Sequence, residues 1–588
     1  MIWLRYGLVL ALVLAINVLL WAIPNRPQPL TPPPGGKIRS VSFAPFREGQ
    51  SPLLKIYPTA AQIDADLQAI SSHVAGIRTY SSLEGMEATP ELAAKYGLNV
   101  TMGAWLGKKP DVNDLEIASL IRLATDHPET IRRVIVGNEV LLRKDLRPDQ
   151  LIAHIRKVKS SVSQPVTYAD VWEFWLKYPE IAAEVDFITI HILPYWEDIP
   201  AGIDEVRERV LEAVHAIQTR FPGKPILIGE AGWPTAGRVR GPAEPGLAAT
   251  GRFINTFLHL AETRGFDYNL IEAFDQTWKA RLEGTVGSHW GLFTTERQAK
   301  FPLNGPVVEN PHWRLHAGLS GGLAVLLTLM AVTGRSRPVG FWRFLALALG
   351  VQIMSSALLR AAAMAMDWNH FLYDQALAVL LLWLESVCAV VLSRRLGQWA
   401  CGELHVAPGY QRVTASAFSP FHRHFFCALE SAPVPGNRQL PDAGATALLL
   451  LSGLAVIWSM LLVVDGRYRD FPIPDYLAPI LGLLTLATVR ALTGPTSSSP
   501  LAGLSFGLAI RGHRLIGAAG APRTWRRAMT LAPWETALAA LLLLGAGACL
   551  VAEGITNREA VQWAALQGLL ALPYAATVAL ARLGYEPA

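Results

Sequence analysis

Two patterns of apolar and polar positions divide this chain. Between residues 38 and 309, short β-rich apolar runs alternate with stretches whose apolar residues recur about every 3.6 positions, as on one face of a helix. Beyond residue 311 the apolar runs become long enough to cross a bilayer core of about 30 Å. The pattern therefore predicts an α/β domain followed by a polytopic α-helical membrane domain.

Eight candidate strands alternate with helices in the first pattern. Eight strands over about 270 residues are typical of a (β/α)8 TIM barrel, for which about 250 residues are usual. A doubly wound open sheet is the alternative, but it usually has fewer strands, and the glycine-rich phosphate turn that normally follows its first strand is missing here. We expect strands at 40–45, 75–80, 98–106, 133–139, 165–170, 185–191, 225–233 and 269–276, and helices at 59–72, 113–126, 149–161, 203–220 and 247–264.

The N-terminal apolar run carries one charge, Arg5, near its start. It lacks a small-x-small cleavage site and is followed by Pro24 and Asn25, which favours a retained anchor over a cleaved signal peptide. A proline-rich and semi-rigid spacer comes next. The predicted domains are an anchor at 1–23, a linker at 24–36, the barrel at 37–310, and a membrane domain of about seven helices at 311–588.

Loop charges give the orientation of the predicted spans. Arginines concentrate in the loops expected to face inward, whereas the outward loops contribute only Arg467, Arg469 and Arg558. This asymmetry is the positive-inside pattern. It predicts a multi-pass protein of the inner (cytoplasmic) membrane, with both termini cytoplasmic and residues 24–314 outside. The spans are expected near 315–333, 341–362, 371–393, 444–464, 475–493, 533–552 and 561–583.

Composition excludes several classes of protein. A net charge of +5 over 588 residues gives no case for nucleic-acid binding. None of the four cysteines lies between residues 24 and 310, so the outer domain has no disulfide framework. No Cys-x-x-Cys pair is present. We predict neither a metal nor a cofactor.

Two glutamates end predicted strands: Glu139 in "VIVGNEVLLR" and Glu230 in "PILIGEAGW". Catalytic groups of a (β/α)8 barrel lie at the C-terminal strand ends, and strands four and seven face each other across the mouth. Glycosidic-bond cleavage needs such a pair of carboxyl groups. A single glutamate there is more often a solvated loop residue, but the pair favours catalysis. Other candidates, for substrate binding, are Tyr80, Trp105, Asn138, Asp170, His191, Tyr195, Trp233, Glu272, Trp278 and Lys279.

The same segments carry a family resemblance. "VIVGNEVLLR" and "PILIGEAGWPTAG" resemble the two catalytic motifs of glycoside hydrolase family 17, the β-1,3-glucanases and β-1,3-glucanosyltransferases. "IRTYSSLEG", "HILPYWE", "EAFDQTWK" and "SHWGLF" fit its second, sixth and eighth strand regions, so the resemblance covers about residues 38–305. It implies that Glu139 is the proton donor, that Glu230 is the nucleophile, and that Asn138 binds the sugar 2-hydroxyl.

These roles set expectations for the surroundings. Glu139 has to be protonated near neutral pH, so burial or the neighbouring anion is expected to raise its pKa. Glu230 has to stay ionised and needs donors, of which Tyr195 is one candidate. The eighth strand departs from the family, which commonly has Glu at position 276 and often an acidic residue at position 287. We therefore expect Lys279 to lack one or two of its usual anionic neighbours.

The resemblance also implies the reaction. The substrate would be β-1,3-glucan or its oligosaccharides, processed by retention through a covalent glycosyl-enzyme, and the motifs do not separate hydrolysis from transfer. Bacterial members with membrane tails look like glucanosyltransferases, which suggests glucan synthesis or remodelling beside a glucan synthase. Two alternatives stay open: a glucan-binding sensor without turnover, and an accessory subunit of a glucan exporter or synthase.

Other polar residues of the sequence have weaker claims to a functional role. Asp64 and Asp66 have Asp-x-Asp spacing but lie mid-helix, where a solvated face is expected. His422 and His424 are expected to be loop residues. The charged residues in or beside the predicted spans are costly in hydrocarbon and usually mark a pair or a pathway. Arg360 and Asp374 could pair near the outer interface, and the deeper Glu385 could have a transport-related role.

Overall fold

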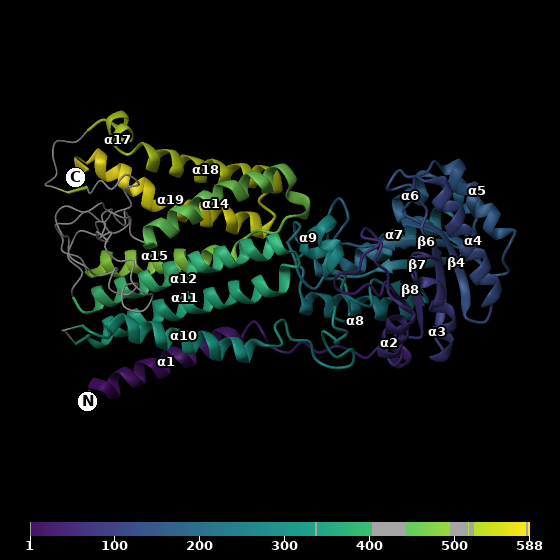
Figure 1. Cartoon of the computed structure of the whole chain (residues 1–588), viewed down its shortest axis with the longest axis horizontal. Coiled ribbons are helices and arrows are strands. Elements are labelled where there is room, and N and C mark those ends of the chain that lie inside the picture. Colours follow the sequence, from purple (N-terminus) through teal and green to yellow (C-terminus); the bar gives the residue numbers. More distant parts are fainter. Residues whose placement is uncertain are drawn as a thin grey trace. The chain divides into compact units, whose positions relative to one another are not determined.

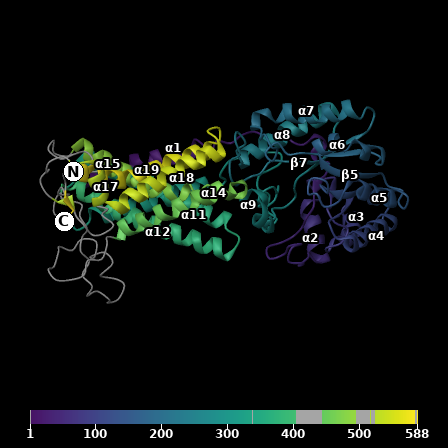
Figure 2. The ribbon, with the colours of Figure 1, turned by 90° about the horizontal axis from the view of Figure 1, so that it is seen from above.

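The protein consists of two compact units, Arg26–Glu309 and a helical unit formed by Met1–Asn25 with Asn310–Ala588. A computed structural model describes residues 2–335, 338–402, 443–493, 515–516, 523–583 and 586–587. Figures 1 and 2 show the strands and helices of both units.

The first unit is a closed barrel of eight parallel strands in sequence order, with β8 returning to pair with β1. Closure confirms the (β/α)8 fold and excludes the open sheet, because no strand is left as an edge. Each strand overlaps its predicted segment. The strands are β1 (Val41–Ser42), β2 (Gly76–Arg78), β3 (Asn99–Ala104), β4 (Ile131–Asn138), β5 (Val166–Val171), β6 (Ile188–Ile192), β7 (Ile226–Ala231) and β8 (Asp267–Leu270).

Helices surround these strands (Figures 1 and 2). The five predicted helices form, as α2 (Ala60–Ile70), α4 (Pro110–Asp126), α5 (Pro148–Lys159), α7 (Val206–Arg220) and α8 (Leu247–Arg264). Three helices were not predicted, because they have only 6 to 9 residues and two turns are too few to show a 3.6-residue period. They are α3 (Thr89–Lys95), α6 (Trp172–Lys177) and α9 (Ala280–Ser288).

The strands are apolar because both of their faces are covered. Each of the five residues of β6 is buried, as are the last five of β4. Parallel strands between a filled barrel interior and a helix layer have no solvated side, which gives continuous apolar runs rather than alternation. The polar residues within or directly after such runs are therefore the exceptions that need a function or a partner.

Asp66 is one such exception, on helix α2. It is 1% exposed, and it lies on the apolar helix face with Ile63, Leu67 and Ile70. Its carboxylate accepts hydrogen bonds from Arg47 at 2.7 Å and from Arg297 at 2.7 and 3.0 Å. The prediction of a solvated face was wrong for this residue, because Asp66 pairs with two arginines that lie outside its helix, 19 and 231 positions away.

We expect Asp66→Ala to destabilise the barrel by about 3–5 kcal/mol, because a buried ion pair broken on one side leaves an uncompensated charge. The charge left behind is that of Arg297, whose side chain is 10% exposed. Denaturant unfolding of the full chain, followed by barrel tryptophan fluorescence, measures this cost. Asp64→Ala is the matched control, because Asp64 pairs with Lys95 at an exposed site and should cost less than about 1 kcal/mol. Equal losses in both variants would contradict the prediction.

The second unit is a bundle of helices lying side by side (Figures 1 and 2). Six of its described helices are long and apolar enough to cross a membrane. The predicted spans at 475–493 and 561–583 are also helical but differ from these six: the apolar part of α15 is shorter and contains Pro479, and α19 carries Gln562 and Gln567. The six are α1 (Ile2–Ala22), α10 (Trp313–Val332), α11 (Phe341–Trp368), α12 (Leu372–Ala400), α14 (Ala443–Asp465) and α18 (Pro533–Glu553); the other two are α15 (Pro474–Thr493) and α19 (Arg558–Arg582).

Helix α1 is tied into this bundle by polar contacts. The Asn17 amide, 1% exposed, donates to the Ala317 carbonyl at 2.8 Å. Its oxygen accepts from the hydroxyls of Ser320 on α10 and Ser356 on α11, each at 3.2 Å. A buried amide with these partners fixes both the depth and the rotation of α1 against its neighbours.

The charged residues of the predicted spans behave differently from one another. Glu385 is fully buried on α12, and neither of its carboxylate oxygens has a hydrogen-bond partner within the described residues. Arg360 is exposed, and no ion pair joins it to Asp374 in the part of the chain that the structure describes. His422 and His424 lie outside the described residues.

Candidate active site

The predicted glutamates lie at one end of the barrel, where the strand register places them. Parallel pairing of β6 with β7 sets His191 opposite Glu230. On β4 the register places Asn138 opposite Ala169 of β5, and the next amide, that of Glu139, donates to the Ala169 carbonyl at 2.8 Å. Three strands thus bring two acids and an imidazole to the same mouth.

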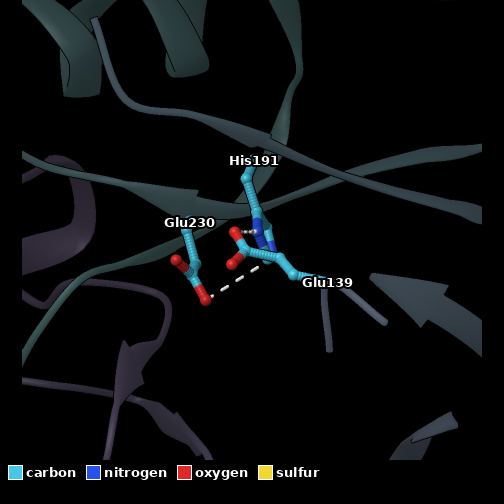
Figure 3. A group of neighbouring side chains, drawn as sticks. All are labelled: Glu139, His191 and Glu230. Atoms are coloured by element: carbon cyan, nitrogen blue, oxygen red, sulfur yellow. Dashed lines mark hydrogen bonds and ion pairs between the residues drawn. The ribbon is translucent and has the colours of Figure 1, made fainter. Parts of the chain in front are cut away.

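The two carboxyl groups meet there. One oxygen of Glu139, one oxygen of Glu230 and one ring nitrogen of His191 all lie within 4.8 Å of one another. Figure 3 shows the imidazole contacting both carboxylates. The pair, 91 positions apart in the sequence, therefore shares one small volume.

The backbone at Glu139 is in the left-handed region, with φ of 51°. Gly137, two residues earlier, has φ of 88°, and a Cβ there would lie 2.7 Å from the Val140 side chain. A non-glycine residue in this region costs on the order of 1 kcal/mol or more and is found mostly where function requires it. The chain turns sharply out of β4 and presents the carboxyl group at the mouth.

Glu230 is 4% exposed and is held by two donors. The Tyr80 hydroxyl donates to its Oε1 at 2.9 Å, and the Arg78 guanidinium does so at 3.2 Å. Charge-assisted donors of this kind stabilise the ionised carboxylate. Tyr195 was expected in this place, but its hydroxyl donates to the Arg238 carbonyl at 2.7 Å, so that expectation was wrong.

Arg78 is a site residue that sequence reasoning missed. It is 1% exposed at the end of β2 and reaches across the barrel to two other strands. Its guanidinium donates to the Gly229 carbonyl at 2.7 Å and to Asn138 Oδ1 at 2.5 Å, besides Glu230. The available signal was a single arginine inside an otherwise buried strand, where charge is rare unless paired.

The electrostatics of Glu139 differ from the expectation. Burial raises the pKa of its carboxyl group, but the hydrogen bond and charge of His191, followed by the charges of Arg143 and Arg78, lower the pKa more. The net direction is below the ordinary value, so the predicted rise was wrong. The reason is that the closest neighbour of Glu139 is an imidazole at 2.8 Å rather than an anion.

The same three side chains could by distance hold a metal ion, since each offers one ligand atom. The charge distribution works against this. A hydrogen-bearing nitrogen of Arg78 lies 3.4 Å from His191 Nε2 and 3.2 Å from Glu230 Oε1. A guanidinium so close repels a second cation. The arrangement is therefore better suited to handling protons than to holding a metal ion.

Comparison with known proteins fits this geometry. Residues 40–291, nearly the whole barrel, match the family model of the BtgE/BtgC glycoside hydrolase domain. The barrel is therefore similar to this glycoside hydrolase domain over nearly its whole length. A glucan 1,3-beta-glucosidase of Schizosaccharomyces pombe is 29% identical over 258 residues, or 41% of this chain and 79% of the relative. A glucan 1,3-beta-glucosidase of Saccharomyces cerevisiae is 25% identical over 272 residues, or 42% and 86%.

A solved structure is also similar to the barrel. The glycoside hydrolase family 17 beta-1,3-glucanosyltransferase of Rhizomucor miehei is 24% identical, with a TM-score of 0.41, and covers 46% of this chain and 98% of its own. The likeness to a glycoside hydrolase domain rests on the family match and the curated relatives.

The expected departures near the eighth strand, at positions 276 and 287, are offset locally. Lys279 donates to Glu272 at 2.8 Å, and the charge of Glu283 on α9 also acts on it. A Cβ at Gly287 would lie 2.8 Å from a carboxylate oxygen of Glu283, which therefore fills the space of a side chain at that position. Lys279 keeps two anionic neighbours, so its expected loss does not occur. Burial, opposed by Lys279, raises the pKa of Glu272 to about 7.

Asp170 lies beside the glutamate pair but is fully buried. It accepts from the Tyr168 hydroxyl and from the Val171 amide, the latter at 2.8 Å. Burial raises its pKa to about 6, and the charge of Glu139 adds to the rise. Asp170 is thus placed beneath the site rather than in contact with solvent, which differs from the predicted substrate contact.

The predicted aromatic contacts divide into two groups. Trp105 is 38% exposed, with the Arg143 guanidinium 4.1 Å from the centre of its ring, and Trp278 is half-buried. Both retain a face for a sugar ring. Trp233 is 1% exposed and its indole donates to the Glu244 carbonyl, and Tyr195 is fully buried. These two pack in the core, and their predicted contacts with a substrate stay predictions.

Proposed function

We propose that this protein is a membrane-anchored, retaining enzyme that cleaves β-1,3-glucan and passes the glycosyl group to water or to another glucan. Glu139 protonates the leaving oxygen, and Glu230 attacks the anomeric carbon to form a glycosyl ester. Asn138, held by Arg78, accepts or donates a hydrogen bond at the sugar 2-hydroxyl.

The observation that carries this proposal is the short separation between the glutamates. Retaining enzymes place their carboxyl groups about 5–5.5 Å apart, whereas inverting enzymes need about 6.5–9.5 Å to admit a water molecule. Oxygens of Glu139 and Glu230 within 4.8 Å of each other support the retaining arrangement. The donors on Glu230 support its role as the ionised partner.

The substrate is proposed from the relatives. Those of Schizosaccharomyces pombe and Saccharomyces cerevisiae carry the name glucan 1,3-beta-glucosidase, and the two alignments span 79% and 86% of their lengths. Exposed Trp105 and half-buried Trp278 supply aromatic faces of the kind that stack on sugar rings. Neither feature separates hydrolysis from transfer.

The proposed location is the cytoplasmic membrane of a bacterium, with the barrel on its outer side. Six apolar helices of sufficient length and the inward bias of arginine support it. The buried hydrogen bonds of Asn17 support retention of α1 as part of the bundle. An enzyme held there would act on glucan as a synthase delivers it.

Incubation of the full chain, purified in detergent, with laminari-hexaose tests the proposal. We expect mass spectrometry to find products shorter than the hexaose, and also longer ones if an acceptor sugar competes with water for the glycosyl ester. Cello-hexaose, with β-1,4 linkages, is the matched control and should remain intact. Unchanged laminari-hexaose would contradict the proposed function.

A further inference from the structure

His191 occupies an unusual place between the two acids. It lies on β6, is 1% exposed, and contacts both carboxylates (Figure 3). Its Nδ1 lies 2.8 Å from Glu139 Oε1, and its Nε2 lies 3.5 Å from Glu230 Oε1. A substrate-binding role, predicted from its strand-end position, does not explain why both ring nitrogens face acids.

The hydrogen-bond donors around His191 Nε2 limit where the hydrogens of the imidazole ring can lie. The nearest nitrogen, Arg78 Nη1, has two hydrogens and donates to the Gly229 carbonyl at 2.7 Å and to Glu230 at 3.2 Å. Neither hydrogen is left for the imidazole, and an arginine nitrogen cannot accept one. A carboxylate oxygen, Glu230 Oε1, lies 3.5 Å from Nε2. A hydrogen on Nε2 can point toward this oxygen, which leaves Nδ1 to share a proton with Glu139 at 2.8 Å.

The charged groups facing His191 come from four strands. Glu139 follows β4, Asp170 ends β5, Glu230 lies on β7, and Arg78 ends β2. Of these groups, Glu139 is in the closest contact with the ring, at 2.8 Å. The hydrogen bond and charge of His191 are the main causes that lower the pKa of Glu139, so the protonation of each side chain depends on the other.

We propose that His191 is the proton reservoir of the general acid, a positioning residue that acts through Glu139. Before reaction the proton lies on Nδ1 of the imidazolium. As the glycosidic bond breaks, the proton moves across the hydrogen bond to Glu139 Oε1, and Glu139 delivers a proton to the leaving oxygen while Glu230 bonds to the anomeric carbon. His191 is left neutral with its hydrogen on Nε2.

The second half of the reaction reverses the proton path. Glu139 takes a proton from water or from an acceptor hydroxyl, whose oxygen bonds to the anomeric carbon as the ester to Glu230 breaks. Glu139 then returns a proton to Nδ1, so the site ends with the same protons as it began. This inference rests on the proposed function and explains how a carboxyl group with a lowered pKa can serve as an acid.

The pH dependence of His191→Asn in the full chain tests the reservoir. The asparagine amide keeps a donor near the Nδ1 position but cannot take up a proton. We expect kcat/KM on laminari-hexaose to fall by about 10–100-fold at the optimum. The alkaline limb should also move to lower pH by about 1–2 units, because the ordinary pKa of an imidazole lies above that of a carboxyl group and the variant has no imidazole to store the proton. His154→Asn, a histidine on the outer helix α5, should leave the profile unchanged.

The outcomes distinguish a failure of the proton reservoir from a failure of the proposed function. A uniform loss in His191→Asn with an unmoved alkaline limb, or a limb that moves to higher pH, would overturn the reservoir and leave the proposed function standing. Full activity in Glu230→Gln would instead overturn the proposed function. If thermal melting shows that His191→Asn is unfolded, the same profile of His191→Gln decides, since its amide reaches toward the Nε2 position and likewise stores no proton.

Discussion

Glu230→Gln is expected to lower kcat/KM on laminari-hexaose by about 10⁴-fold or more, with the fold retained. The amide is nearly isosteric, so Tyr80 and Arg78 keep a carbonyl oxygen to bond. An amide oxygen is too weak a nucleophile to form the glycosyl ester. Product analysis with the full chain in detergent measures the loss. Glu129→Gln is the matched control, because the Glu129 side chain is 92% exposed.

The nature of the loss can be examined with Glu230→Ala. Truncation opens space at the attacked face of the sugar, and external azide can enter it and bond to the anomeric carbon. In a retaining site the resulting glycosyl azide has inverted configuration, since only one displacement has occurred. A variant that turns over like the wild type, or an azide product of retained configuration, would contradict the assignment of Glu230 as nucleophile.

The sequence was sufficient for the fold and for the glutamate pair because both follow from local rules. Apolar runs with turn signals identified eight strands, and a parallel barrel sends each strand's C-terminal residues to the same mouth. Glu139 and Glu230 therefore could be paired before any distance was known. The position of strand ends along the chain carries this information.

The partners of that pair could not be predicted, because they depend on side-chain reach across the barrel. Arg78 reaches from β2 to Gly229 on β7, which is 151 positions away in the sequence. The spacing of apolar residues does not indicate the direction in which a guanidinium extends. Tyr195 was expected at Glu230 from its place after β6, but it packs under Trp233 and Trp290. The prediction for Asp66 was wrong for a similar reason, because its arginine partners lie outside its own helix.

The direction of the pKa shift of Glu139 could not be predicted from the sequence either. Burial and a nearby anion both raise a carboxyl pKa, and these were the two influences that sequence could suggest. The decisive neighbour is His191, whose distance of 2.8 Å follows from the β4, β6 and β7 register together. A family motif specifies which residues are present but leaves open which proton they share.

Arg78→Met is expected to lower kcat/KM by about 10³-fold and the free energy of unfolding by about 3–5 kcal/mol, because it leaves a buried carboxylate without its cation. That carboxylate is Glu230, which is 4% exposed and would lose the guanidinium while it keeps the hydrogen bond from the Tyr80 hydroxyl. Asn138 Oδ1 and the Gly229 carbonyl would lose donors as well. Activity assays and denaturant unfolding of the same preparation measure both effects.

Arg78→Lys separates charge from geometry. The ammonium group keeps the positive charge near Glu230, but it cannot span the three acceptors that the planar guanidinium joins. We expect stability close to that of the wild type and activity lower by about 10²-fold. Arg147→Met removes an exposed pair with Asp149. It should lower the free energy of unfolding by less than about 1 kcal/mol and leave the activity unchanged. Wild-type activity in Arg78→Lys would refute the geometric role; if both Arg78 variants resemble Arg147→Met, the cation does not stabilise Glu230.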